Sequence, residues 1–391
     1  MDFNRLASRL GNIAPFHVME LAKMAAELER QGRHIIHMGI GEPDFTAPPP
    51  VIEAAARAMA DGRMQYTAAV GIPALRAVIA EHYRRVYGLE IAPSRIVVTA
   101  GASAALLLAC AALVERDAEV LMPDPSYPCN RHFVAACEGR AKMIPSGPEQ
   151  RFQLSDAMVR EHWSAATRGV LLASPSNPTG TSIAADELRK IVATVREKQG
   201  FTIVDEIYQG LSYDAAPFSA LSLGDDIVVI NSFSKYFSMT GWRLGWLVVP
   251  EALLPQIEKL AQNLFICASS IAQHAALACF LPESLAVYEA RKEEFRRRRD
   301  YIVPALRELG FKVPVMPDGA FYVYADCSAL ADDADRLTID MLNLAGVELV
   351  PGLDFGAHTA RQYIRLSYAT SMENLREAVA RLRKFFGERA D

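Results

Sequence analysis

The chain has 391 residues, of which 51% are hydrophobic and 22% are charged, and its formal net charge is −5. This composition predicts an ordinary globular protein with enough apolar material for one large core, or for a large domain and a smaller one. It argues against a nucleic-acid-binding protein, because the balance is acidic and the most basic run, RKEEFRRRRD at 291–300, is interrupted by glutamates and suits a solvated helix face.

From about residue 34 the sequence alternates short apolar runs with helical patterns. Such alternation is typical of βαβ units, in which helices cover both faces of a mostly parallel sheet. We therefore predict an α/β fold for the larger part of the chain. The expected strands are HIIHM at 34–38, RIVVTA at 95–100, AEVLMP at 118–123, GVLLAS at 169–174, FTIVDE at 201–206, DIVVINS at 226–232 and LGWLVV at 244–249, and the expected helices lie at 51–60, 102–113, 130–137 and 184–198.

The pattern changes near residue 284, where a long charged helical stretch begins and runs to Gly310. The short alternating runs beyond it predict further strands, with helices between them. These are FKVPVM at 311–316, FYVYAD at 321–326 and YIRLSYA at 363–369. We predict a large domain at 46–285 and a smaller α+β domain formed by 1–45 together with 286–391.

The start of the chain has no signal-peptide pattern, and no apolar run reaches the roughly eighteen residues of a membrane span, so we expect a cytoplasmic protein without membrane contact. The six cysteines are scattered and form no CxxC pair, which indicates buried free thiols in a reducing compartment. We expect no metal site.

Polar residues follow several predicted strands at the point where each strand ends. In open α/β sheets, ligands bind at the carboxyl ends of the strands. The turn at Gly101 also joins a strand to a helix, and the free N–H groups of a helix N-terminus suit a phosphate. The residues concerned are Asn177 after the run at 169–174, Asp205 and Tyr208 at the end of 201–206, and Ser232 and Lys235 at the end of 226–232, with Arg243 further along.

Each of these residues also has an ordinary structural interpretation. Asp205 alone could cap a helix, Asn177 could form a turn, and Arg243 could belong to an ion pair. Two nucleotide-binding motifs are not supported, because the turn at Gly101 lacks GxGxxG and no GxxxxGK[ST] accompanies the acidic strand at 201–206. Jointly, a phosphate cradle, a carboxylate, a lysine and an arginine favour one shared site.

The sequence resembles the class I/II aminotransferases of pyridoxal-phosphate fold type I. The resemblance rests on motifs in the same order over nearly the whole chain, of which SFSKYFSMTGWRLG at 232–245 is the most specific. The others are GIGEPDF at 39–45, SPSNPTG at 174–180, DEIY at 205–208 and RLSYATSMENL at 365–375. The resemblance implies pyridoxal 5'-phosphate as cofactor and a homodimer with shared active sites.

The resemblance implies a role for each polar residue. Lys235 would form a Schiff base with the cofactor's aldehyde and later carry the proton of the substrate Cα, and Asp205 would pair with the pyridine nitrogen. Asn177 and Tyr208 match residues that hydrogen-bond the phenolic oxygen of the ring. Tyr127 in PDPSYP matches the aromatic residue that stacks on the ring, and a core aromatic is its ordinary alternative.

The phosphate and substrate contacts follow from the same resemblance. Arg365 in YIRLSYA matches the arginine that clamps the substrate α-carboxylate, and a structural ion pair is its ordinary alternative. Gly41 and Asn177 match positions near the same substrate, and Tyr66 in MQYTAAVG matches a tyrosine that reaches the phosphate of the neighbouring subunit. The implied phosphate ligands are the turn at Gly101, the backbone N–H groups of Ala102 and Ser103, the hydroxyls of Ser103 and Ser232 with Ser234 as a supplement, and the guanidinium of Arg243.

We therefore predict an aminotransferase with a ping-pong cycle, in which an L-amino acid leaves as a 2-oxo acid and a second oxo acid, 2-oxoglutarate or pyruvate, collects the amino group. The segment AQNLFICASSIAQ at 261–273 contains no arginine for a second carboxylate, which favours small or apolar donors. Two alternatives remain. A lyase of the same fold, such as a C–S lyase, would keep every cofactor residue, and a non-enzymatic regulator would need a DNA-binding module, for which the segment before residue 34 is too short.

Overall fold

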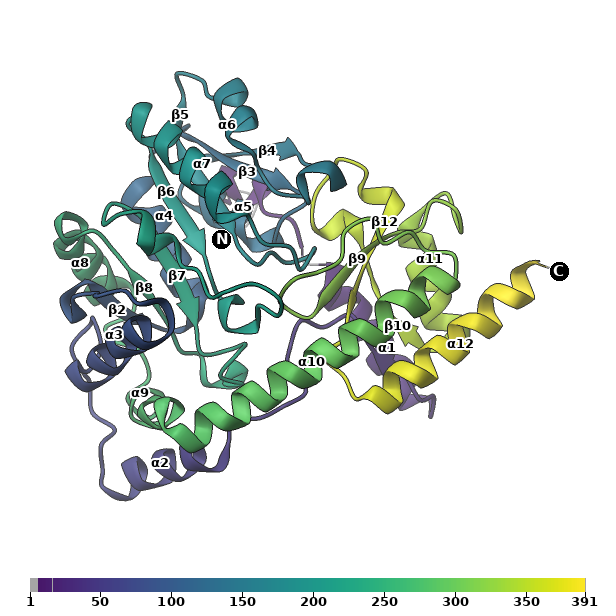
Figure 1. The fold of residues 1–391 in the computed structure, drawn as a ribbon, viewed down its shortest axis with the longest axis horizontal. Coiled ribbons are helices and arrows are strands. Elements are labelled where there is room, and N and C mark those ends of the chain that lie inside the picture. Colours follow the sequence, from purple (N-terminus) through teal and green to yellow (C-terminus); the bar gives the residue numbers. More distant parts are fainter. Residues whose placement is uncertain (1–5, 16, 391) are drawn as a thin grey trace.

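The computed structural model describes residues 6–15 and 17–390, so residues 1–5 and 16 of the predicted smaller domain, and residue 391, lie outside the described part. A seven-stranded sheet in the order β2-β8-β7-β6-β5-β3-β4 forms the centre of the larger part (Figure 1). Strands β3 to β7 pair in parallel, and β8 is antiparallel to both of its neighbours. The predicted mostly parallel α/β sheet is confirmed. Its strands are β2 (Ile96–Thr99), β3 (Glu119–Asp124), β4 (Arg140–Pro145), β5 (Thr167–Ala173), β6 (Phe201–Asp205), β7 (Val228–Ser232) and β8 (Gly245–Val248).

The sheet is buried on both faces, because successive side chains of a strand point to opposite sides. In β2, Val97 packs in one apolar cluster while Ile96 and Val98 pack in the other. This double burial explains why the strands are continuous apolar runs in the sequence. The helices of this part are α2 (Pro49–Ala60), α3 (Pro73–Tyr87), α4 (Gly101–Leu113), α5 (Pro128–Ala136), α6 (Asp156–His162), α7 (Ala185–Glu197), α8 (Leu254–Leu264) and α9 (Ser270–Ala276).

A second region holds two small sheets, shown at the right of Figure 1. One is antiparallel and has the order β11-β12-β9, and the other is the parallel pair β1-β10. The long helix α10 (Pro282–Glu308) runs from the neighbourhood of α2 to α12. The predicted domain boundary at residue 285 falls inside this helix, and the division into domains remains a prediction. The other elements are α1 (His17–Arg30), β1 (Ile36–His37), β9 (Tyr322–Asp326), α11 (Ala334–Asp340), β10 (Val347–Glu348), β11 (Val350–Pro351), β12 (Tyr363–Ser367) and α12 (Met372–Ala390).

Several elements differ from the sequence-based expectation. The run HIIHM forms β1 in the second region and does not join the seven-stranded sheet. The run FKVPVM forms only an isolated bridge between Lys312 and Asp326, and its Pro314 has no N–H to donate to a strand partner. Strand β4 was not expected, because it lies at the sheet edge and its mixed exposure produces no continuous apolar run.

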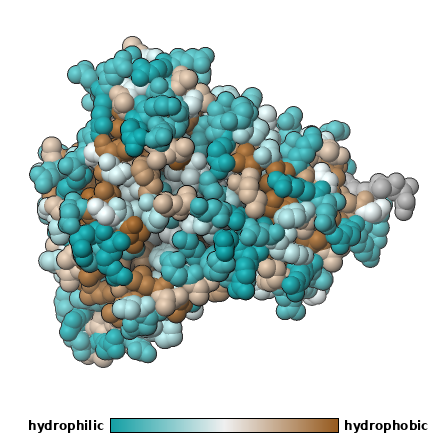
Figure 2. All heavy atoms as spheres, in the orientation of Figure 1, coloured by the Kyte–Doolittle hydropathy of each residue, from teal (hydrophilic) through white to brown (hydrophobic). Residues whose placement is uncertain are grey.

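The surface is mixed in character. On the face shown in Figure 2, hydrophobic side chains appear in separate areas among hydrophilic ones. Among the described helices, none is both long and apolar enough to cross a membrane. Within the same part of the chain, no group of three or more histidine, cysteine, aspartate or glutamate side chains is arranged to hold a metal ion.

Candidate active site

A cavity of about 580 Å³ lies at the carboxyl ends of the central strands. The strand register brings these ends together, because Ala173 pairs with Asp205, and Gly245 of β8 lies opposite both Thr99 and Ser232. Twelve of the sequence-predicted site residues therefore line one cavity. They are Gly41, Ala102, Ser103, Tyr127, Asn177, Asp205, Tyr208, Ser232, Ser234, Lys235, Arg243 and Arg365.

Two predicted residues do not line this cavity. Gly101 is the first residue of α4 and precedes the lining residues Ala102 and Ser103. Tyr66 is 81% exposed and lies outside the cavity of its own chain. Its predicted role in a neighbouring subunit remains a prediction.

The start of α4 and Arg243 form one end of the cavity. Gly101 has a φ of 79°, and a Cβ on it would lie 2.5 Å from Nη2 of Arg243, so glycine allows the guanidinium to approach the helix start. A Cβ on Gly245 would likewise lie 2.8 Å from the backbone nitrogen of Ala102. Within the described chain, no carboxylate pairs with Arg243, and the first N–H groups of a helix have no partner inside it. This end of the cavity is therefore suited to an anion.

Ser232 belongs to the same end of the cavity. It is 2% exposed, its hydroxyl donates to the carbonyl oxygen of Leu244 at 3.3 Å, and it accepts from the N–H of Ser234 at 3.0 Å. These bonds fix the chain just before Lys235.

Asp205 lies at the floor of the cavity, at the end of β6. Its Oδ1 accepts the N–H of Ile207 at 3.1 Å, and the side chain is 4% exposed. Burial raises the pKa of Asp205 to about 7, while the N–H of Ile207 and the charge of Lys235 oppose the rise. No cationic side chain of the described residues forms an ion pair with this carboxylate, which would gain from a bound cation.

Lys235 reaches the same space from the segment after β7. Its Nζ donates to the carbonyl oxygen of Gly41 at 2.5 Å. Burial lowers the pKa of Lys235 to about 8; Arg365 and Arg243 act in the same direction, and Glu42 and Asp205 act against it. Its amine is therefore closer to neutrality at physiological pH than an ordinary lysine.

Arg365 lies in β12 at the opposite side of the cavity and is 2% exposed. Its Nη1 donates to Oδ1 of Asn177 at 2.8 Å, and its Nη2 donates to the carbonyl oxygen of Gly39. The guanidinium lies 4.6 Å from the ring centre of Tyr322 and 4.7 Å from that of Phe355. No described carboxylate forms an ion pair with it, and its buried Nε has no hydrogen-bond acceptor. The alternative of a structural ion pair is therefore not supported.

Two tyrosines connect these groups. The hydroxyl of Tyr208 lies 2.8 Å from that of Tyr322, and both side chains are buried. Burial raises the pKa of Tyr208 far above its ordinary value, so its phenol stays protonated and can donate. Tyr127 lines the cavity at the N-terminus of α5, and burial likewise raises its pKa.

Sequence reasoning missed several lining residues. Tyr322 is one, although the alternation in FYVYAD indicates that two tyrosines share a face of β9. Glu42 follows Gly41 in the motif GIGEPDF and could have been found from it. The other missed residues are apolar or small side chains of helices, a strand end and loops, and no motif marks them: Val18, Met19, Ala22, Ile40, Leu106, Ala173, Pro175, Ile207 and Thr240.

The fold and the cavity define an α/β enzyme of pyridoxal-phosphate fold type I. The chain belongs to the family "Aminotransferase class I and II", whose model matches residues 33–382. Valine–pyruvate aminotransferase of Mycobacterium tuberculosis is 38% identical over 381 residues, which cover 97% of this chain and 98% of that protein. A crystal structure of an aminotransferase from the same organism has a TM-score of 0.95 and 36% identity, and covers 98% of this chain and 100% of the other. Aspartate aminotransferase from Thermus thermophilus with maleate has a TM-score of 0.92 and 34% identity, with coverage of 98% and 100%. The protein is an aminotransferase, and its family uses pyridoxal phosphate.

Proposed function

We propose that the protein uses pyridoxal 5'-phosphate to move the amino group of an L-amino acid to 2-oxoglutarate or pyruvate in a ping-pong cycle. The observation that carries this proposal is Arg365, a buried guanidinium without a carboxylate partner in the described chain, on the same cavity as Lys235. A buried charge is costly unless an anion pairs with it. Amino acids and 2-oxo acids share an α-carboxylate, so one arginine serves both halves of the cycle.

The cavity fits the cofactor at both of its charged ends. Arg243 and the start of α4 would hold the phosphate, and the cradle exists because Gly101 leaves room for the guanidinium. Asp205, whose pKa burial raises to about 7, would gain a cationic partner in the protonated pyridine nitrogen. The remaining contacts would be Tyr127 on the ring face and Asn177 and Tyr208 on the phenolic oxygen.

Lys235 is the residue to which we assign covalent attachment and proton transfer. When bound, pyridoxal phosphate supplies an aldehyde and a ring that accepts electrons from the substrate Cα. Lys235 would be the residue that holds this aldehyde, and its amine, when free, would carry the proton of the substrate Cα. A pKa lowered to about 8 supports this role, because a base must be partly neutral at the working pH.

We propose small or apolar donor side chains. The cationic side chains lining the described cavity are Lys235, Arg243 and Arg365, and each already has a role at the aldehyde, the phosphate or the α-carboxylate. None remains for a second carboxylate on the donor. The apolar residues contributed by α1 and by Ile40 support the same choice, as does a relative named for valine and pyruvate.

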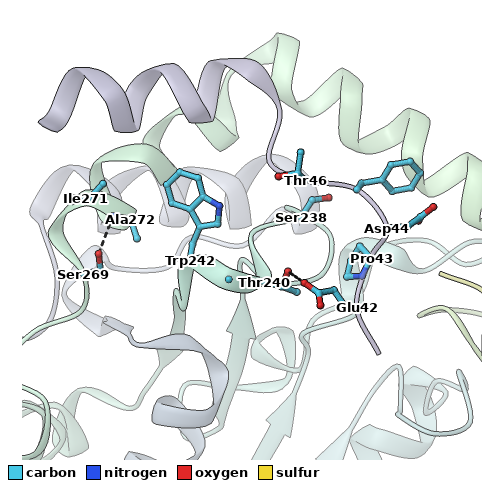
Figure 3. A pocket seen from close by; sticks show the side chains of 12 residues that line it. Glu42, Pro43, Asp44, Thr46, Ser238, Thr240, Trp242, Ser269, Ile271 and Ala272 are labelled. Atoms are coloured by element: carbon cyan, nitrogen blue, oxygen red, sulfur yellow. Dashed lines mark hydrogen bonds between the residues drawn. The ribbon is translucent and has the colours of Figure 1, made fainter. Parts of the chain in front are cut away.

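We also propose a homodimer in which Tyr66 of the partner subunit completes the phosphate site. This proposal is supported by a second cavity of about 740 Å³, which shares Glu42 and Thr240 with the first. A partner subunit that occupied it would lie next to the active site. Figure 3 shows the segment at 42–46 on one side, the segment at 269–272 on the other, and Trp242 between them. Tyr66 is exposed and lies outside the cavity of its own chain, which fits a residue that contacts the phosphate site of the other subunit.

The proposed location is the cytoplasm. All six cysteines lie within the described residues and carry free thiols, which supports a reducing compartment.

A donor screen tests the proposed reaction. Leucine, valine, alanine and aspartate would each be incubated with 2-oxoglutarate or pyruvate, and the amino acid product, the oxo acid product and ammonia would be measured. We expect the new amino acid and the new oxo acid in equal amounts, and no reaction with Lys235→Ala. Release of ammonia without a new amino acid would instead indicate a lyase.

A further inference from the structure

The first turns of α1 form one wall of the active-site cavity. Val18, Met19 and Ala22 line it, and Ile40 lies on the same cavity. Met19 is 54% exposed and Ile40 is 42% exposed, so these apolar side chains are available to a ligand. A substrate whose carboxylate is held by Arg365 would bury apolar surface against this wall.

The N-terminus of α1 is held by a residue far along the sequence. Oδ1 of Asp354 accepts the N–H of His17 at 2.9 Å, and Oδ2 accepts the N–H of Val18 at 2.9 Å. The side chain of Asp354 is 1% exposed. A carboxylate at this point satisfies two otherwise unpaired N–H groups and interacts with the positive end of the helix dipole. Because a helix as short as α1 is only marginally stable alone, its placement depends on such contacts.

Asp354 is in turn fixed to the larger part of the molecule. Its carbonyl oxygen accepts from Nη2 of Arg131 in α5 at 2.8 Å, and the carbonyl oxygen of Phe355 accepts from the N–H of Ser126 at 2.8 Å. Ser126 and Arg131 lie on either side of Tyr127, the residue assigned to the cofactor ring. Asp354 thus connects the wall formed by α1 to the cofactor end of the cavity.

We propose that Asp354 is a positioning residue for the side chain of the amino donor. Its carboxylate fixes the first turn of α1 and thereby holds Val18 and Met19 against an apolar side chain. Asp354 does not line the cavity, so it acts through the helix and not by contact with the substrate. The inference rests on the proposed aminotransferase function with its small or apolar donors. Among these donors, Asp354 would favour long apolar side chains over alanine, whose methyl group buries little surface.

The test compares Asp354→Ala and Asp354→Asn, which keeps one acceptor oxygen, with the same changes at Asp333. Asp333 is a matched control, because it caps α11 through the N–H of Asp335 at 2.9 Å and does not line the cavity. Steady-state kinetics would be measured with leucine and alanine, and calorimetry would give the Kd of 4-methylpentanoate, a carboxylate with the leucine side chain and no amine. Hydrogen exchange would report the amides of residues 17–24 with and without cofactor.

For Asp354→Ala we expect the leucine KM and the 4-methylpentanoate Kd to rise about ten-fold, the alanine KM and both kcat values to stay within about two-fold, and exchange at 17–24 to accelerate. The asparagine variant should show a smaller change in the same direction. The Asp333 variants should change none of these quantities. Equal losses for leucine and alanine, or unchanged exchange at 17–24, would overturn the proposal.

A double-mutant cycle shows whether Asp354 acts through the wall. Met19→Ala alone should weaken 4-methylpentanoate binding, and combining it with Asp354→Asn should cost less than the product of the two single effects. If the effects of Met19→Ala and Asp354→Asn on binding are independent, Asp354 does not act through the wall formed by α1 and the proposal is refuted. This test does not need Asp354→Ala to fold. A failure of the proposed function can be told apart from a failure of the Asp354 proposal. If the proposed function is wrong, the unmodified protein shows no transamination. The role of Asp354 is still decided by hydrogen exchange and by 4-methylpentanoate binding.

Discussion

Replacing Arg365 with lysine keeps the positive charge and removes the planar fork of donors. Arginine has five N–H groups, and here one is used by Asn177 and one by the carbonyl of Gly39, which leaves three for a ligand. A lysine ammonium that keeps both acceptors has one N–H group left. A substrate carboxylate that accepts from two of the three arginine donors would then lose one charge-assisted hydrogen bond, about 1.5–3 kcal/mol, so kcat/KM should fall roughly 10- to 150-fold.

The assay separates a role in substrate binding from a role in folding. The Kd of 4-methylpentanoate should rise by the same factor as kcat/KM falls, while the cofactor absorbance and the Tm should change little. Arg361→Lys is the matched control, because this nearby arginine is 65% exposed and pairs with Asp333 at the surface. A lowered Tm together with nearly normal 4-methylpentanoate affinity would refute the reasoning and make Arg365 a structural residue.

Three further predictions use other contacts of the cavity. Asp205→Asn should stabilise the cofactor-free protein at neutral and alkaline pH, because burial raises the pKa of Asp205 to about 7. The free-energy cost of burying the ionised carboxylate is absent at acid pH and grows as the pH rises above the pKa of the unfolded chain. It reaches up to about 4 kcal/mol above pH 7. Equal Tm values for both proteins from pH 4 to 9 would contradict this. Gly41→Ala places a Cβ 2.2 Å from the hydroxyl oxygen of Tyr322, so 4-methylpentanoate binding should weaken about ten-fold, and Tyr322→Phe should restore part of it; no rescue would exclude this clash as the cause. Mixing Lys235→Ala subunits with Tyr66→Phe subunits should give hybrids with one intact site and more activity than either parent, whereas a fully active monomer in sedimentation would disprove the shared site.

The residues that perform chemistry could be predicted largely because they follow strands. Parallel strands end at one edge of a sheet, so Asp205 at the end of β6 and Ser232 at the end of β7 had to lie close together once their runs were identified. Lys235 follows within the same segment. The turn at Gly101 could also be predicted, because a strand, a glycine and a helical pattern occur in direct succession. In each case the signal is local, and the sheet supplies the long-range proximity.

The other side of the cavity has no such local signal. Arg365 and Asn177 meet across 188 positions of sequence, and His17 meets Asp354 across 337. Alternation in β9 places Tyr322 and Tyr324 on one face, but only the packing decides that Tyr322 reaches Tyr208 while the ring of Tyr324 stacks on Tyr363 at 4.7 Å.

Helical periodicity in α1 likewise predicts an apolar face, but it does not predict which surface that face packs against. The side-chain wall therefore depends on how the second region is held against the sheet, and a single cap such as Asp354 can alter donor preference without altering any residue that touches the substrate.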